Sequence, residues 1–315
     1  MKSKNFLKAT AKGAAFVIFI AILFAALTVT AYAQIDKNAR IVVDYTNTPT
    51  TGTVSINLVS AIAPLEARVR IEKDGMQYDY RLKNDGTAEF FPLQMGNGEY
   101  LVRVLIGPVP DSGGRFQVGI TSTYRLRLSS SNVNAVFLSP SQFVNFNRNS
   151  KITAKAAELV KDANARTDLE KIEAIYKFVI EELEYDMDKA DRVVKGEMAG
   201  YVPIVDEILS AGMGICFDYA TVFAAMLRSQ NIPAKLVMGN VANPDPKMPA
   251  GSTVYHAWNE FYLKERGGWF KINEMRFTGE QFERVDPTFD STGNGTTRAM
   301  QFIGNGSNYM KFKEY

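Results

Sequence analysis

The chain has 315 residues, a formal net charge of +2, one cysteine and one histidine. Near-neutral charge gives no electrostatic footprint for nucleic acid, one cysteine cannot form a disulfide within the chain, and one histidine excludes a zinc site of histidine and cysteine ligands. With 46% hydrophobic residues, a chain of this length can bury the cores of two domains.

The N-terminus has the order of an export signal. Four lysines precede an apolar run from Ala14 to Thr30, and Ala31-Tyr32-Ala33 forms a small-x-small cleavage site. We therefore predict a signal peptide at residues 1–33 and a secreted or otherwise extracytoplasmic protein. The apolar run is a little short for a membrane-spanning helix of about 20 residues. An uncleaved anchor that ties the protein to the membrane or cell envelope is the alternative.

Residues 39–138 have the pattern of an antiparallel β-sandwich. Short runs alternate apolar and polar residues, as in ARVRIEK at 67–73 and EYLVRVLI at 99–106. The turn sequences KDG, NDG and GNG place glycines at 75, 86 and 98, a spacing of short strands that is typical of a sandwich. No helical period is visible there.

The pattern changes after a connector at residues 139–151, and residues 152–315 are predicted to form a second domain with a C-terminal tail. Thr167 and Glu170 fit a capping box that begins a helix. The glycine-punctuated segment 187–214 is predicted to be a long loop that shapes a site.

A further helix is predicted from Cys216 to Gln230, ended by Asn231 and Pro233. Strand-like runs follow: AKLVMGNV, VYHAWNEFYLK, WFKINEMRF and QFERVDPTF. One buried helix followed by an antiparallel sheet is an α+β arrangement. The predicted fold class is therefore α+β, with an N-terminal antiparallel β-sandwich.

The single thiol, Cys216, lies where a thiolate would be stabilised. Gly212 and Gly214 permit a sharp turn that places the sulfur at the helix N-terminus, where unpaired N–H groups and the helix dipole favour negative charge. The same N–H groups can hold an oxyanion. His256 is the only imidazole that can shuttle a proton, and Asp286, at the end of a later strand, is placed to orient it.

Each of these three residues has an ordinary structural explanation. A buried cysteine is often a small hydrophobe, a histidine in an aromatic strand is often a core residue, and an aspartate before proline often forms a turn. Their joint occurrence, in the order Cys216, His256 and Asp286, favours the catalytic interpretation.

At these residues the sequence resembles the transglutaminase-like superfamily, of the bacterial exported type. The resemblance is carried by GMGICFDYATVFAAMLRSQNIPAKLVMG, YHAWNEFY and VDPTF, and it covers roughly residues 168–290. It implies a papain-like α+β core with a nucleophile at Cys216, a base at His256 and an orienting acid at Asp286.

The third position of the triad has an alternative. In many members of the family the acid follows a tryptophan by four residues, and here Trp269 is followed at that distance by Asn273. The stretch EMRFTGEQFER looks like an insertion, after which Asp286 precedes the expected proline and threonine. We favour Asp286, but Asn273 also fits because related cysteine enzymes orient their histidine with asparagine.

Several aromatic residues are candidates for lining the cleft. Tyr255 and Trp258 flank His256, and core packing is the alternative role for both. Tyr201 or Tyr185 is a candidate side-chain donor to the oxyanion.

The pattern predicts an enzyme that transfers acyl groups from amide bonds of a protein or peptide, without a cofactor. No metal is expected, because no acidic cluster has EF-hand spacing. We expect hydrolysis of protein or cell-wall peptides, since water is always present whereas transfer needs an amine site. Transglutaminase cross-linking or deamidation, and a non-catalytic surface scaffold, are the alternatives.

Overall fold

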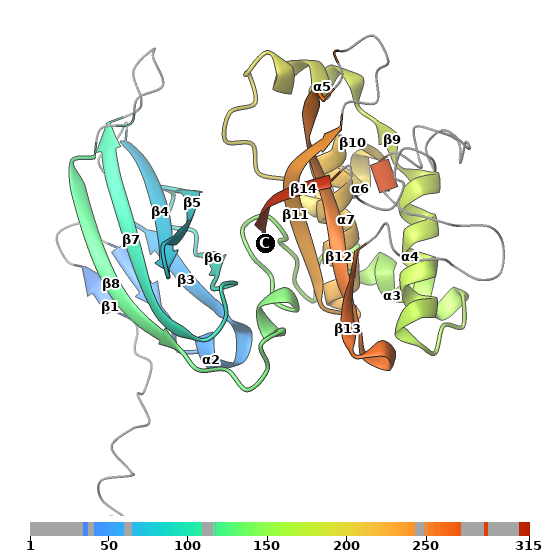
Figure 1. Cartoon of the computed structure of the whole chain (residues 1–315), viewed down its shortest axis with the longest axis horizontal. Coiled ribbons are helices and arrows are strands. Elements are labelled where there is room, and N and C mark those ends of the chain that lie inside the picture. Colours follow the sequence, from blue (N-terminus) through green and yellow to red (C-terminus); the bar gives the residue numbers. More distant parts are fainter. Residues whose placement is uncertain are drawn as a thin grey trace, which may run out of the picture.

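The chain folds into two parts, a β-sandwich and a part in which helices cover a sheet (Figure 1). This computed structural model describes residues 34–36, 41–59, 65–108, 116, 118–242, 249, 251–271, 287–288 and 309–315. The arrangement confirms the predicted α+β fold class. Within the described residues, no helix is long and apolar enough to cross a membrane. The predicted signal peptide or anchor lies outside them.

The sandwich consists of two four-stranded antiparallel sheets, with strand orders β1-β2-β3-β6 and β5-β4-β7-β8. Its strands alternate buried and exposed residues, as the sequence predicts. The bounds are β1 (Gln34–Asp36), β2 (Ile41–Asp44), β3 (Thr53–Leu58), β4 (Leu65–Lys73), β5 (Met76–Leu82), β6 (Glu89–Pro92), β7 (Gly98–Pro108) and β8 (Ile120–Leu128). Two short helical turns that were not predicted are α2 (Thr48–Thr51) and η1 (Ala135–Phe137).

The predicted turn KDG is a two-residue hairpin. Lys73 pairs with Met76, and the two residues between them, Asp74 and Gly75, have φ of 49° and 79°. Positive φ at both central positions matches the right-handed twist of the strands, which is why this dipeptide favours a hairpin.

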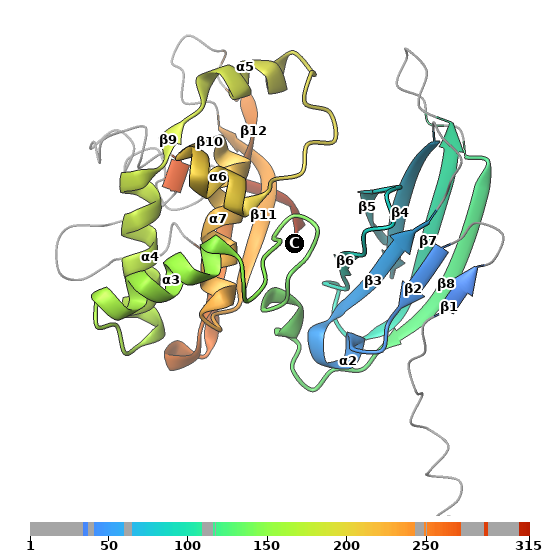
Figure 2. The same cartoon turned by 180° about the vertical axis from the view of Figure 1, so that it is seen from behind.

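The second part has helices packed on a sheet of order β13-β12-β11-β14 (Figure 2). Helix α7 is buried along most of its length between that sheet and helices α3 and α4. The helices are α3 (Lys151–Asp162), α4 (Asp168–Glu182), α5 (Met187–Val194), α6 (Val205–Ala211), α7 (Cys216–Ser229) and η2 (Lys264–Arg266). The strands are β9 (Glu184–Tyr185), β10 (Met213–Gly214), β11 (Ala234–Ala242), β12 (Thr253–Leu263), β13 (Gly268–Lys271) and β14 (Tyr309–Glu314).

The start of α4 is as predicted. Thr167 Oγ1 accepts from the N–H of Glu170, and the Glu170 carboxylate accepts from the N–H of Thr167. The prediction of one long loop at 187–214 is wrong, because that segment contains α5 and α6. Asp186 caps α5 by accepting from the N–H of Lys189, and Gly212 ends α6 in the left-handed region.

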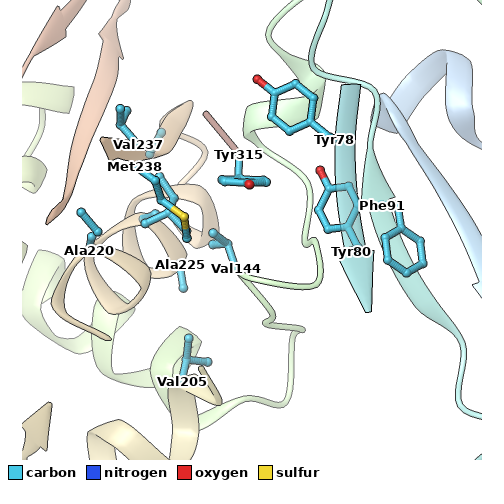
Figure 3. Close-up of a cluster of buried hydrophobic side chains, with 14 of the residues drawn as sticks. Tyr78, Tyr80, Phe91, Val144, Val205, Ala220, Ala225, Val237, Met238 and Tyr315 are labelled. Carbon is cyan, nitrogen blue, oxygen red and sulfur yellow. The ribbon is translucent and has the colours of Figure 1, made fainter. Parts of the chain in front are cut away.

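The two parts meet at an aromatic cluster that includes the last residue of the chain (Figure 3). The Tyr315 ring lies 5.5 Å from that of Tyr78 and 5.8 Å from that of Tyr80, both in β5, and 4.8 Å from that of Phe143 in the connector. Phe143 in turn contacts Phe217, the second residue of α7. The predicted C-terminal tail is therefore an edge strand whose end packs against the sandwich.

Candidate active site

The approach to the only thiol is a tight backbone turn. After Gly212, strand β10 pairs in parallel with β9, so that Gly214 lies opposite Tyr185. Ile215 occupies the N-cap position of α7, and Cys216 is the first residue of the helix. The first N–H groups of a helix lie outside its hydrogen-bond ladder, so this end favours an anion.

Cys216 is a free, half-buried thiol, and two tyrosines interact with it electrostatically. The pKa of Tyr185 is raised to about 12, first by burial and then by the charge of Cys216. The pKa of Tyr255 is also raised, by partial burial first and by Cys216 second. An electrostatic interaction with Cys216 thus contributes to both shifts. Tyr255 is 61% exposed, and its role as a cleft-lining residue stays a prediction.

A buried carboxylate, Asp218, lies two residues after the thiol. It is 0% exposed and accepts from the backbone N–H of Ile215 at 2.9 Å. The Lys189 ammonium donates to one of its oxygens at 2.6 Å, and the Tyr201 hydroxyl donates to the other at 2.7 Å. The Tyr201 proton is thus bound to Asp218, and the tyrosine also borders a cavity of about 270 Å³ between α5 and α6.

His256 lies in β12, opposite Gly239 of β11, and is buried. Its ring is stacked on Trp258 with centroids 6.3 Å apart, and Tyr309 of β14 lies at the same distance. Trp258 is 3% exposed and occupies the space that a side chain at Gly239 would fill. Of the two roles considered for Trp258, core packing and a place in the cleft, these contacts correspond to core packing.

Helix α7 is fixed against β12 near its start. The Asn259 amide donates to the carbonyl of Ala220, one turn after Cys216, at 2.9 Å. Tyr255, which directly precedes His256, interacts electrostatically with Cys216. Side chains alternate along a strand, so His256 begins on the face opposite Tyr255. The contact between His256 and Cys216 therefore stays a prediction.

The two candidates for the third member of the triad, Asp286 and Asn273, lie outside the described residues. Just after Asp286, Pro287 and Thr288 are helical and buried. Among the residues that the structure describes, no group of three or more histidine, cysteine, aspartate or glutamate side chains could hold a metal ion.

Sequence reasoning did not assign the network of Lys189, Asp218 and Tyr201. Asp218 has a local signal, because an acidic residue three positions after the N-cap is well placed to cap a helix. Lys189 has none, because it lies 29 residues from Asp218 and approaches only when α5 folds over the start of α7.

With this geometry established, residues 154–273 match the sequence pattern of the Transglutaminase-like superfamily. In this stretch the chain is similar to the transglutaminase-like superfamily. The finding confirms the resemblance seen at the cysteine and histidine blocks. The matched region contains Cys216 and His256 and ends at Asn273, so Asp286 lies beyond it.

Solved structures similar to this chain include a proposed cysteine protease and a transglutaminase. A proposed cysteine protease from Cytophaga hutchinsonii is 14% identical, with 84% of this chain and 76% of that chain covered and a TM-score of 0.38. The periplasmic domain of TgpA from Pseudomonas aeruginosa is 18% identical, with 74% and 93% covered and a TM-score of 0.34. Red sea bream transglutaminase is 12% identical, with 80% and 54% covered and a TM-score of 0.26. No curated protein matches the chain.

Proposed function

We propose that this chain is an exported cysteine-dependent enzyme that transfers acyl groups from amide bonds. In this proposal Cys216 is the nucleophile, His256 is the base, and Asp286 orients the imidazole. The observation that supports it most directly is the place of the only thiol, half-buried at the first position of the central helix α7. A thiol at such an end ionises more readily than one inside a helix.

The proposed reaction begins when the Cys216 thiolate attacks the carbonyl carbon of an amide. A C–S bond forms, and the carbonyl electrons move to oxygen, which lies at the helix N-terminus. Tyr185 is the better of the two phenols proposed for the oxyanion, because the Tyr201 proton is bound to Asp218. With its pKa raised to about 12, Tyr185 keeps its proton at neutral pH and can donate it in a hydrogen bond.

The first half of the reaction ends when His256, which holds the proton taken from the Cys216 thiol, gives it to the leaving amine as the C–N bond breaks, and a thioester remains on Cys216. The second half decides the product. Water or an amine attacks the thioester carbon and passes a proton to His256, the C–S bond breaks to restore the thiolate, and the product is a carboxylic acid with water or a new amide with an amine. We favour hydrolysis of protein or cell-wall peptides, since water is always present and transfer requires a second site for the amine.

Alkylation of the purified protein by iodoacetamide tests the nucleophile and its partners. We expect Cys216 to be modified faster than a small free thiol, because in this proposal an imidazolium pairs with its thiolate, and we expect that rapid phase to be lost in His256→Ala. Asp286→Asn should slow it without unfolding the protein, while Asn273→Ala should leave it unchanged. Labelling no faster than that of a small free thiol would favour a non-catalytic scaffold. If Asp286→Asn left alkylation unchanged and Asn273→Ala slowed it, the residue that orients His256 would be Asn273.

Mass spectrometry of model peptides, incubated with and without an added amine, identifies the product. Hydrolysis predicts cleavage or deamidation that does not depend on the amine. Cross-linked mass shifts that appear only with the amine would instead show transfer. Cys216→Ala is the control and should abolish both.

A further inference from the structure

The proposed chemistry leaves unused a charged network directly behind the nucleophile. Lys189 Nζ donates to Asp218 at 2.6 Å and to the Tyr201 hydroxyl oxygen at 2.6 Å, and that hydroxyl donates to the other Asp218 oxygen at 2.7 Å. The ammonium also lies 4.1 Å from the centre of the Tyr201 ring. The three side chains thus form a closed triangle.

Helix capping alone does not explain this network. The cap needs one acceptor for the Ile215 N–H, and a neutral amide oxygen would serve. Asp218 is instead an anion that is fully buried, which is costly unless a cation pairs with it. Lys189 is that cation, and its own side chain is only 16% exposed.

The network also bears on the charge near the sulfur. Cys216 and Asp218 both lie in the first turn of α7, and both interact electrostatically with the Tyr185 phenol. An uncompensated carboxylate there would oppose formation of a thiolate, because like charges disfavour each other's ionised forms. A lysine bound to the carboxylate cancels that effect.

The same lysine holds α5 in place. None of the residues of α5 is buried, so apolar packing contributes little to holding this helix in place. Lys189 projects from α5 to Asp218, and Tyr201 reaches the same carboxylate from the segment that follows. The network therefore ties this segment to the start of α7.

We propose that Lys189 is a positioning residue for the nucleophile, which acts through Asp218 to cancel the charge beside Cys216 and to fix α5 over the start of α7. This rests on the proposed function, in which Cys216 reacts as a thiolate. Among the described residues, the other titratable groups that interact with Cys216 include Tyr185 of β9 and Tyr255 of β12, with His256 next to Tyr255 on the strand. Asp186 and Tyr219 also act on Tyr185.

The test is the pH dependence of Cys216 alkylation, which needs no substrate. We expect Lys189→Met to raise the midpoint of the profile by about one pH unit, the scale on which a nearby charge acts. Lys189→Arg should restore most of the shift. Lys195→Met removes an exposed lysine just after the same helix and should leave the midpoint unchanged. An unchanged midpoint in Lys189→Met would overturn the proposal.

If Lys189→Met fails to fold, a second pair of variants isolates the effect of the Lys189 charge. Asp218→Asn keeps an acceptor for the helix cap but leaves the lysine unpaired, so the midpoint of Cys216 alkylation in this variant should fall. Adding Lys189→Met to it removes both charges and should bring the midpoint back up. Equal midpoints in these two variants would refute the charge role. The proposed function is judged separately, by the loss of rapid alkylation in His256→Ala.

Discussion

At the scale of single residues, Gly214 shows how little freedom the turn before the thiol has. A Cβ at this position would lie 2.5 Å from Asp218 Cβ and 2.9 Å from Asp218 Oδ2. Asp218 cannot move aside cheaply, because Lys189 and Tyr201 hold its carboxylate. The glycine is required by this close approach, since its φ lies outside the left-handed region.

We therefore expect Gly214→Ala to lower the free energy of unfolding by about 1–3 kcal/mol, the usual cost of overpacking a core. Urea unfolding measures this, and Cys216 alkylation should slow in the same variant. Gly268→Ala is the matched control, because a Cβ there meets only the Phe270 ring at 3.9 Å. If Gly214→Ala and Gly268→Ala were equally stable, the turn before Cys216 would accommodate a methyl group with no loss of folding free energy.

Sequence reasoning succeeded at this scale where the signals were local. The glycines before Cys216 and the periodicity after it predict the thiol at a helix start, and both lie within one short stretch. The contact of Lys189 with Asp218 depends on how α5 folds back, and no spacing encodes that. The approach of His256 to Cys216 is of the same kind, which is why it stays a prediction.

At the scale of elements, Arg228 joins the end of α7 to three other segments. It is buried, and its guanidinium donates to the carbonyls of Ala234 at 2.9 Å, Ser139 at 2.8 Å and Tyr315 at 2.8 Å. Burial lowers its pKa to about 9, so it remains charged at neutral pH. No acidic side chain in the described part of the chain forms a salt bridge with it, so the carbonyls alone offset its desolvation.

Arg228→Met should lower the free energy of unfolding by about 3–5 kcal/mol, because three backbone oxygens each lose a charged donor, and of these the Tyr315 oxygen keeps the N–H of Leu236. Denaturant titration followed by circular dichroism gives the value. Arg127→Met offers a comparison at the surface, where the side chain is 74% exposed, and should change stability by less than about 0.5 kcal/mol. A loss at Arg228 no larger than that at Arg127 would contradict the bridging role.

The elements that the sequence predicts well are those with strong periodicity. The alternation in β5 and the helical spacing after Thr167 each survive into the structure because burial enforces them. Helix α5 was not predicted because it has no buried face. Strand β14 was not predicted because its partner β11 lies far away in the sequence. Tertiary contacts specify both.

At the scale of the whole molecule, the sandwich and the transglutaminase-like domain share one aromatic core. Tyr315 fits between Tyr78 and Tyr80 on one side and β11 on the other (Figure 3). The Gln94 amide adds a polar link, with bonds of 3.1 Å to the Tyr80 hydroxyl and to the carbonyl of Glu314. The sandwich is thus packed against the domain and is more than a tethered spacer.

Tyr315→Ala should cost about 3–5 kcal/mol of stability, as removal of a buried aromatic ring does. We also expect calorimetry to resolve two unfolding transitions in place of one, since the parts would then unfold separately. Phe312→Ala removes a ring that is 56% exposed on the same strand and should leave a single transition at the original temperature. A single, unshifted transition in Tyr315→Ala would show that other contacts couple the two parts.

The position of β14 also has a consequence for biosynthesis. A ribosome delivers the sandwich first, and β11 emerges well before its edge partner, residues 309–314. Until that partner arrives, β11 presents an open edge, and Phe217 lacks the support that Tyr315 provides through Phe143. The helix that carries Cys216 therefore reaches its final packing only after residues 309–315 have been synthesised, about 90 residues later in the chain.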